Sequence, residues 1–547
     1  MTYHRHRPTT TLLLLQWAAF QCIPIDAFFT SPRIVIDARS RSSTSNSDTA
    51  KQKHAAAITA AQALLSSSCS NHDDNNTSPA PSILLLESSS TLGGRVQSDI
   101  TSDGYILDKG FAVFVEEYPT SKKLLDYDAL GLRQFLPGAR VKLGSADAPS
   151  SPSSSLLACV SDPIRRPKDI LKIMTSPVGS ILDKLRLVPL FFILFTKSIE
   201  ELFEMEESDT LSCLQSTYHF SEEFISTFFA PFLEGVYLAP LQEQSSRMFH
   251  FVMKMFTIGS VSLPKGGMQA VTNQLDEKAR QLGVDIRLES RVISIAECVT
   301  TQGRSGGASG DPTRFVVEVD STEGGKDLVK ARYVIIATDV GVTRQLIPDS
   351  ISSPPKQRSV GCIYYGFQSP APLTDPILIL NGEGSADNGS RRNTKGYPIN
   401  NVCFPSVVQT GYAPVGYDLC SVSILEDALA EYEKDDEHAS LDGDVRKQLA
   451  TWFPNYAIDI LDEKKWVRKG VYVIPNAQPA HYHGGESKNR NGNCYANVNG
   501  GLDCSTFQGM KLPHGMFVCG DHMATSSLNG ALESGVNAGD SVANYLR

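Results

Sequence analysis

The chain has 547 residues, of which 41% are hydrophobic and 20% charged, and its net charge at pH 7 is −10. This length exceeds one compact core, so we expect a globular protein of two domains after any leader, and the acidic balance argues against nucleic acid as a partner. Eleven cysteines without a C-x-x-C pair match neither a zinc site nor a small disulfide framework, and we expect reduced, mostly buried thiols.

Residues 1–50 are predicted to be a targeting leader. Arginines and histidines at positions 4–7 precede an apolar run at Leu12–Phe20, which is the order of a signal peptide. Ala27-Phe28 and then a tract rich in serine and arginine follow. This combination is similar to the two-part plastid presequences of algae with secondary plastids, and it predicts a plastid location. A plain secretory signal and an amino-terminal membrane anchor are the alternatives, although the apolar run is short for a spanning helix.

Two elements of a nucleotide-binding unit come next. The alanine-rich segment Ala55–Leu65 predicts a helix, and the wholly apolar segment Ile83–Leu86 predicts a buried parallel strand. That strand ends on an acid, Glu87. In a dinucleotide-binding βαβ unit, an acid at the end of the second strand accepts hydrogen bonds from the adenosine ribose. Glu87 is therefore a candidate ribose ligand.

The next motif is a glycine pair followed by an arginine: Gly93, Gly94 and Arg95. Paired glycines let the backbone approach a phosphate, and the arginine supplies a planar fork of donors for pyrophosphate or a flavin edge. With Asp-Lys-Gly-Phe at Asp108–Phe111, this stretch closely resembles the second FAD motif of the amine oxidase, protoporphyrinogen oxidase and phytoene desaturase superfamily. The resemblance implies that Gly110 and Phe111 also contribute to cofactor binding.

The glycine fingerprint G-x-G-x-x-G/A that should precede the first helix is absent. With Ala57 as the third, helix-packing position, the two phosphate-approach glycines should stand at Gln52 and His54. The strand before them should occupy residues 46–51, which are polar, and the strand-like Ile34–Ile36 lies too far upstream to lead directly into the helix. Either the phosphate loop has been lost or the coding sequence is wrong at this point. The family pattern on both sides of the gap favours the second interpretation.

The middle of the chain is predicted to contain the substrate domain. Residues 146–260 are helical and include the apolar run Leu187–Phe195, which suits the lining of an apolar cavity or a membrane surface, with a buried core helix as the alternative. Residues 346–505 alternate strands with polar loops and predict an antiparallel sheet, on which the side chains of Tyr364–Phe367 would alternate between faces.

The chain returns to the nucleotide-binding domain at Pro264–Met268, a further mark of the family. A helix over Gln269–Leu282 and a strand around Ile286–Leu288 follow. In relatives, the valine of the next strand contacts the adenine through its backbone, and here this residue is Val292.

The far end of the chain carries the other half of the resemblance. Met516–Cys519 predicts a short buried strand, and a helix starts at Leu528. In this superfamily the aspartate of a Gly-Asp turn holds the ribityl or pyrophosphate part of FAD, and the N-terminus of the following helix points at the cofactor. The residues that this resemblance assigns to cofactor binding are Gly520, Asp521, Gly530 and Ala531.

The predicted fold class is α/β, with a three-layer, Rossmann-type FAD-binding domain and an interleaved α+β substrate domain that contains helices and a mixed or antiparallel sheet. The predicted ranges are 1–50 for the leader, 51–145, 261–345 and 506–547 for the FAD-binding domain, and 146–260 and 346–505 for the substrate domain.

The resemblance implies an FAD-dependent oxidoreductase, in which the isoalloxazine accepts hydride while the fold supplies orientation and a dry cavity. No catalytic residue is predicted, and no metal site is expected from the histidines 481, 483, 514 and 522, whose spacing is irregular. Amines, porphyrinogens and isoprenoid polyenes are the substrate classes of the superfamily. The Gly-Asp pair, where amine oxidases usually have Gly-Glu, argues against amines.

We therefore predict a desaturase-like enzyme that takes hydride from a hydrophobic substrate, a carotenoid or another isoprenoid, and that makes peripheral contact with a membrane. A flavoenzyme that oxidises porphyrinogens or amines is one alternative. A non-catalytic relative of the fold that has lost FAD binding is the other.

Overall fold

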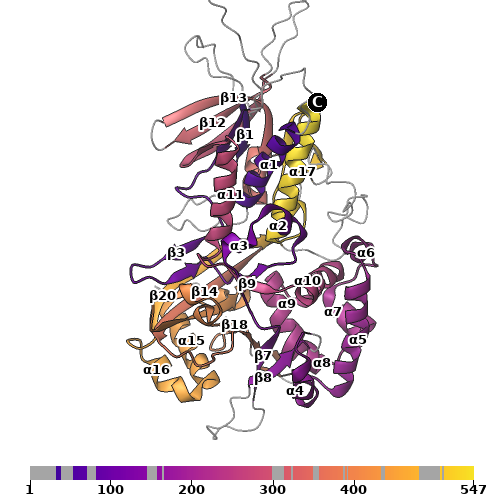
Figure 1. The fold of residues 1–547 in the computed structure, drawn as a ribbon, viewed down its shortest axis with the longest axis vertical. Coiled ribbons are helices and arrows are strands. Elements are labelled where there is room, and N and C mark those ends of the chain that lie inside the picture. Colours follow the sequence, from indigo (N-terminus) through magenta and orange to yellow (C-terminus); the bar gives the residue numbers. More distant parts are fainter. Residues whose placement is uncertain are drawn as a thin grey trace, which may run out of the picture. The chain divides into compact units, whose positions relative to one another are not determined.

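The structure is a computed structural model that describes residues 33–37, 53–69, 82–144, 157–162, 165–298, 313–321, 325–348, 356–385, 389–390, 392–432, 438–479, 506–507 and 510–546. The chain forms two compact units that alternate along the sequence (Figure 1). Unit 1 comprises residues 1–95, 272–355 and 490–547, and unit 2 comprises residues 96–271 and 356–489. Of the predicted leader, residues 1–50, only residues 33–37 are among the described residues.

Unit 1 is built on a seven-stranded sheet with the order β10-β2-β1-β13-β12-β11, and β23 also pairs with β13. The strands are β1 Arg33–Asp37, β2 Ile83–Leu86, β10 Asp285–Arg287, β11 Ser290–Glu297, β12 Phe315–Ser321, β13 Gly325–Ile336 and β23 Met516–Val518. Strands β10, β2, β1 and β23 run parallel with the end of β13, whereas β12 is antiparallel to both of its neighbours, β13 and β11. This sheet confirms the predicted α/β class.

The first strand lies elsewhere than predicted. Residues 46–51 fall outside the described residues, and the strand at the centre of the parallel sheet is β1, which contains Ile34–Ile36. Its residues pair with β2 on one side and β13 on the other. A central strand is buried on both faces and needs an apolar run, which this segment offers and residues 46–51 do not. The prediction that Ile34–Ile36 lies too far upstream was therefore wrong.

Three longer helices accompany this sheet: α1 Lys53–Cys69, α17 Leu528–Leu546 and α11 Gln269–Gln281, the last of which enters unit 1 at Thr272. Helix α12, Val340–Leu346, is shorter. Helices α1 and α17 lie side by side (Figure 1). A Cβ on Gly535 would lie 2.2 Å from the carbonyl oxygen of Ala56, and one on Gly539 would lie 2.3 Å from that of Ala60. The small residues of α17 thus allow close contact between the two helix backbones.

Unit 2 contains a mixed seven-stranded sheet with the order β20-β14-β19-β18-β15-β7-β8. Its strands are β7 Gly138–Leu143, β8 Leu157–Ser161, β14 Gln357–Gln368, β15 Leu378–Gly382, β18 Ile399–Cys403, β19 Tyr417–Leu425 and β20 Val467–Pro479. Smaller sheets pair β3 Ser98–Ile100 with β4 Ile106–Asp108, and β9 Val261–Leu263 with β5 Phe114–Val115 and β6 Arg133–Gln134.

The chain first enters unit 2 at Val96, whereas the sequence placed this passage after residue 145. Strand pairing explains the difference, because β5 pairs with β9 and β7 pairs with β15, all within unit 2. Long-range pairing of this kind is not visible in the local sequence pattern.

The helices of unit 2 are α2 Pro119–Leu124, α3 Tyr127–Leu130, α4 Ile170–Thr175, α5 Ile181–Thr196, α6 Ile199–Phe203, α7 Thr210–Ser212, α8 Glu222–Phe224, α9 Ala230–Tyr237, α10 Ser246–Ile258, α13 Pro405–Val408, α14 Glu426–Ala430, α15 Ala439–Trp452 and α16 Ala457–Leu461. Helices α4–α10 gather at one end of this unit and α15 and α16 at the other (Figure 1). Within the described residues, no helix is long and apolar enough to cross a membrane.

Candidate functional site

Glu87 follows β2 at the carboxyl end of the parallel strands and is fully buried. Its carboxylate accepts hydrogen bonds from the backbone N–H of Ser89 at 2.5 Å and from the Ser88 hydroxyl at 3.4 Å. Its backbone carbonyl accepts a bond of 2.7 Å from the N–H of Ser290, the first residue of β11. The predicted adenine contact, Val292, is buried on this strand. The structure thus brings both residues to the sheet edge where open α/β folds bind ligands.

Arg95 and Asp521 form a buried ion pair between distant parts of the sequence. An Nη2 donor of Arg95 lies 2.5 Å from Oδ2 of Asp521, and the two side chains are 7% and 5% exposed. Gly93 and Gly94, directly before the arginine, have φ angles of 123° and 57°, which favour glycine. Burial opposes ionisation of Asp521, but Arg95 and His522 outweigh it, and the pKa of Asp521 lies well below its ordinary value. The Arg95 guanidinium therefore favours the charged form of Asp521.

The turn before Asp521 is fixed by the last helix. Gly520 has a φ of 146°, and the hydroxyl of Ser534 accepts a hydrogen bond from its N–H and donates one to its carbonyl, both at 2.9 Å. A Cβ on Gly530 would lie 2.0 Å from the carbonyl oxygen of Thr525, and Ala531 is fully buried. The predicted residues Gly530 and Ala531 thus lie in the tightly packed start of α17, and Ser534 of the same helix holds the turn at Gly520. Ser534 is a further residue of this site that was not predicted, although it follows Gly530 at helical spacing.

In unit 2, Asp108 ties together three separate segments. Its carboxylate accepts hydrogen bonds from the Ser98 hydroxyl at 2.6 Å, the backbone N–H of Met268 at 2.9 Å and the Tyr412 hydroxyl at 2.8 Å. The hydroxyl of Tyr364 donates to the backbone carbonyl of Asp108 at 2.9 Å. Burial raises the pKa of Asp108. The Asp-Lys-Gly-Phe motif and the Pro-x-Gly-Gly-Met motif are therefore parts of one hydrogen-bonded structure, which sequence spacing did not reveal.

Gly110 and Phe111, the other predicted residues of this motif, also lie in unit 2. Gly110 has a φ of 92°, and a Cβ there would lie 2.7 Å from Cδ1 of Ile474. Phe111 is partly buried against an apolar cluster that includes Tyr364. The neighbouring Tyr365 lies on the opposite side of β14, where its hydroxyl donates to Asp442 at 2.8 Å. The side chains of β14 therefore alternate between faces, as predicted.

The model of the family described as flavin containing amine oxidoreductase matches residues 58–543. The chain belongs to this family. It is an FAD-dependent oxidoreductase, and FAD is its cofactor. This match confirms the predicted superfamily and cofactor.

Solved structures with a similar fold come from several organisms. One is a protein of Exiguobacterium sp. 255-15 named as a protoporphyrinogen oxidase, with 15% identity and a TM-score of 0.56 over 94% of this chain and 99% of that chain. Another is an oxidoreductase from Methanosarcina mazei, with 13% identity and a TM-score of 0.58 over 93% and 99%. Putrescine oxidase bound to putrescine has 14% identity and a TM-score of 0.54 over 94% and 98%. No curated protein matches the chain.

The residues of this flavoenzyme fit FAD at two places and depart from the family pattern at a third. The buried carboxylate of Glu87 and the packed turn around Gly520 match the needs of the ribose and the ribityl chain. The first glycine of the whole chain is Gly93. The connection between β1 and α1, residues 38–52, therefore contains no glycine, and it lies outside the described residues.

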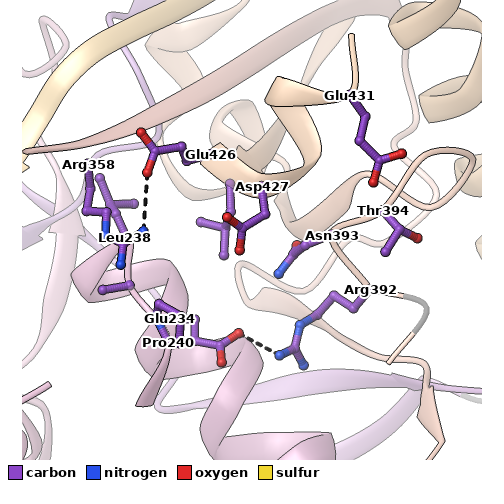
Figure 2. A pocket seen from close by; sticks show the side chains of 12 residues that line it. Glu234, Leu238, Pro240, Arg358, Arg392, Asn393, Thr394, Glu426, Asp427 and Glu431 are labelled. Atoms are coloured by element: carbon purple, nitrogen blue, oxygen red, sulfur yellow. Dashed lines mark hydrogen bonds and ion pairs between the residues drawn. The ribbon is translucent and has the colours of Figure 1, made fainter. Parts of the chain in front are cut away.

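A polar pocket of about 370 Å³ lies within unit 2 of the flavoenzyme (Figure 2). Arg392 pairs with Glu234 at 2.6 Å on one wall, and Arg358 pairs with Glu426 at 3.3 Å on another. Asp427 adds a further carboxylate. An apolar ligand here would strip water from charged groups without replacing their hydrogen bonds, which is costly. This pocket is therefore unsuited to a hydrophobic substrate.

Proposed function

We propose that this FAD-dependent oxidoreductase oxidises a hydrophobic substrate, a carotenoid or another isoprenoid. The observation that carries the proposal is a row of phenylalanine rings in the helical part of unit 2. Phe224 and Phe228 are stacked with ring centroids 5.6 Å apart, and Phe228 and Phe232 are stacked at 6.2 Å. Phe256 of α10 meets Phe232 edge-on at 5.2 Å.

Part of this row is not fully buried. Phe224 is buried, whereas Phe228, Phe232 and Phe256 are only partly buried. Aromatic faces attract flat apolar or conjugated groups and require no charge on the ligand. A polyene fits such a surface better than a protonated amine, which needs a carboxylate or an aromatic cage. The Gly-Asp pair at Gly520-Asp521 supports the same choice.

The roles of FAD and of the residues that we expect to bind it follow from the family. FAD, when bound, supplies the two-electron oxidation by accepting a hydride. We expect Glu87 to accept hydrogen bonds from the ribose hydroxyls, and Val292 to contact the adenine. We expect Arg95 and Asp521 to hold the ribityl and pyrophosphate part, together with the N-terminal turn of α17 at Gly530. We also propose, from the leader in residues 1–50, that the enzyme works in a plastid.

The test is anaerobic reduction of the flavin, which is monitored as the loss of its visible absorbance. Separate reactions offer a carotenoid precursor with few conjugated double bonds, a porphyrinogen and putrescine. Because the flavin itself takes up the electrons, the assay needs no other electron acceptor. Rapid reduction by the isoprenoid alone is expected. Reduction by the porphyrinogen or by putrescine alone would refute the proposed substrate class while leaving the family assignment intact.

A paired variant links the assay to the aromatic row. Phe228→Ala with Phe232→Ala should slow reduction by about tenfold at limiting substrate, since each stacked ring contributes about 0.5–1.5 kcal/mol. Tyr456→Ala is the control, because Tyr456 is also partly buried but packs against the sheet of unit 2. Equal rates in both variants would contradict a role for the row.

A further inference from the structure

Exposed apolar side chains gather on one helix of unit 2. Among the described residues, 20 large hydrophobic side chains are exposed, and eight of them lie in residues 171–195. Five of these form the α5 stripe, which runs along one face of helix α5: Ile181, Leu185, Val188, Phe192 and Phe195. On the opposite face, Leu190 and Leu194 are fully buried. Because a contiguous apolar face of this kind marks an interaction surface, the α5 stripe calls for a partner.

The spacing of the α5 stripe is that of helices that pair with one another. Its members recur at alternating intervals of four and three residues, as the contact positions of a coiled coil do. The members near the start of the helix are aliphatic, whereas the last two, Phe192 and Phe195, are aromatic. An antiparallel pair of α5 helices would therefore place the aliphatic side chains of one copy against the aromatic rings of the other.

Negative charge is concentrated directly after the stripe. Residues 198–209, which contain α6, carry six acids and no lysine or arginine. The fully exposed acids among them are Glu201, Glu204 and Glu206. Three cations lie beside this segment, namely Lys197, Arg247 and the buried Lys254. This end of α5 therefore presents an excess of negative charge.

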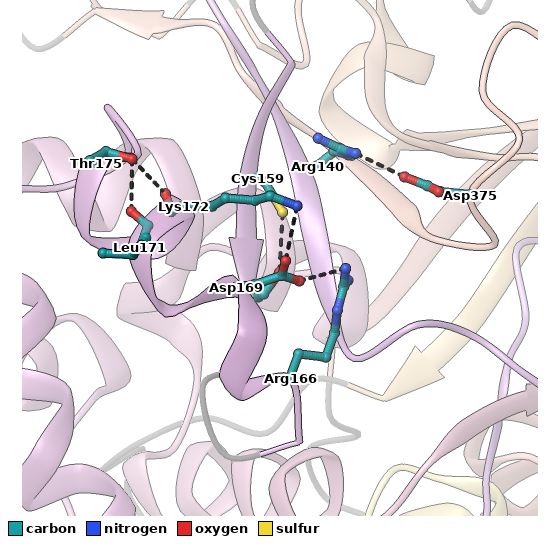
Figure 3. Close-up of polar contacts among 9 residues, drawn as sticks. Arg140, Cys159, Arg166, Asp169, Leu171, Lys172, Thr175 and Asp375 are labelled. Atoms are coloured by element: carbon teal, nitrogen blue, oxygen red, sulfur yellow. Dashed lines mark hydrogen bonds and ion pairs between the residues drawn. The ribbon is translucent and has the colours of Figure 1, made fainter.

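The other end of α5 carries an excess of lysine and arginine. Residues 166–186 contain five of these cations and two aspartates, both of which are buried. Asp169 is held by Arg166 at 2.5 Å and by Lys172 at 3.1 Å (Figure 3). The side chain of Lys172 is nevertheless 71% exposed, and Lys168 is exposed as well. The accessible charge of this segment is therefore positive.

Helix α4, which carries Lys172, flanks the first turn of the stripe. The ammonium group of Lys184, on α5, donates to the backbone carbonyls of Met174 at 3.3 Å and Ser176 at 2.6 Å, both at the end of α4. Helix α6 lies at the other end of α5 (Figure 1). The stripe is therefore bordered by cations at its start and by acids at its end.

Two exposed acids, Glu222 and Glu223, also lie near the start of α5. The hydroxyl of the preceding residue, Ser221, donates to the carboxylate of Asp183 at 2.7 Å. Asp183 is fully buried and lies on the face of α5 opposite to the stripe. Helix α8 therefore joins α5 from behind, and its glutamates reduce the positive excess at this end without bordering the stripe.

We propose that the α5 stripe binds a second copy of this chain, as a two-fold symmetric dimer in which the two α5 helices are antiparallel. A symmetric contact of this kind brings the acids after one stripe to the cations before the other. A parallel contact would set six acids against six acids. An anionic lipid surface would repel the same acids, so a second copy fits the stripe better. The proposal concerns assembly and does not depend on which substrate the enzyme oxidises.

The test is sedimentation velocity of the full-length holoenzyme over a range of protein concentrations. We expect a dimer that dissociates on dilution. Val188→Glu with Phe192→Glu should raise the Kd of the dimer by at least about thirtyfold, which is the effect of losing one central contact of an interface. Ile458→Glu on α16 is the matched control, since Ile458 is 83% exposed but lies outside α5. This control should keep the wild-type Kd, and circular dichroism should show that the variants are folded.

Charge reversal tests the antiparallel arrangement. Glu204→Lys with Glu206→Lys should raise the Kd by about tenfold, because the new lysines would face the cations of the partner. In a parallel dimer, the same change would replace one pair of like charges by another and leave the Kd nearly unchanged. Mixing this variant with Lys168→Glu/Lys172→Glu should restore association, and restoration would also show that both variants are folded.

Three results would overturn the proposal. The first is a wild type that stays monomeric at every concentration, or a dimer that Val188→Glu/Phe192→Glu leaves intact. The second is an unchanged Kd for Glu204→Lys/Glu206→Lys, which would exclude the antiparallel arrangement. The third is a monomer that floats with phosphatidylcholine vesicles and loses this binding in Val188→Glu/Phe192→Glu, which would assign the stripe to a membrane instead.

Discussion

The buried pair of Arg95 and Asp521 allows a quantitative test of how unit 1 is held together. Both side chains are more than nine-tenths buried, so removal of one partner leaves a charge in an apolar environment. Losing one member of a buried pair costs roughly 3–5 kcal/mol. We therefore expect Arg95→Met and Asp521→Asn each to lower the free energy of unfolding by about 3 kcal/mol, the lower end of this range. In Asp521→Asn, the amide oxygen remains as one acceptor for Arg95.

The double variant separates the charge effect from the loss of packing. With neither charge present, Arg95→Met/Asp521→Asn should be destabilised by less than the sum of the single changes, with a coupling energy of about 2 kcal/mol. Urea unfolding of flavin-free protein, monitored by circular dichroism, measures this coupling energy without a contribution from the cofactor. Arg287 and Asp327, 3.7 Å apart with side chains 40% and 60% exposed, form the control pair. Arg287→Met should cost less than about 1 kcal/mol.

The pH dependence provides a second readout of the same pair. The pKa of Asp521 is lower in the folded state than in the unfolded chain, so its stabilising contribution is present above the ordinary aspartate range and is lost as pH falls through the folded-state pKa. The difference in stability between wild type and Arg95→Met should therefore persist at neutral pH and shrink only in strong acid. Single variants that cost under about 1 kcal/mol and add without coupling would refute the role of the pair.

Three further predictions concern other parts of the chain. Gly530→Ala should destabilise the protein by about 1–3 kcal/mol and lower its FAD content, because the start of α17 must move. Gly443→Ala in α15 is the control, because a Cβ there meets nothing within 4 Å. It should stabilise the protein by about 0.5–1 kcal/mol in thermal unfolding. Burial raises the pKa of Asp108, so the contribution of this residue to stability is greatest in acid and is lost as pH rises through the raised pKa. Over that rise, Asp108→Asn should gain stability relative to the wild type. Parallel pH profiles of the two melting temperatures would contradict this. Gln52→Gly with His54→Gly should increase the visible flavin absorbance of the purified chain, and an unchanged spectrum would show that these positions are not the phosphate loop.

The sequence alone determined the cofactor motifs, because their chemistry is local. An acid directly after an apolar strand at Glu87, a glycine pair before Arg95 and a Gly-Asp turn before a helix of small residues are each readable within a few positions. Their order along the chain was enough to predict the family and the α/β class, which the family match confirms.

Only the tertiary structure decided which of these motifs meet. Arg95 and Asp521 are 426 positions apart, and neither their ion pair nor the bond between Asp108 and Tyr412 follows from spacing. The identity of β1 depended on pairing with β2 and β13 rather than on distance from α1. Burial is non-local for the same reason: the apolar pattern of α5 suits a core helix as well as a surface, and the elements packed against it determine which of its faces is exposed.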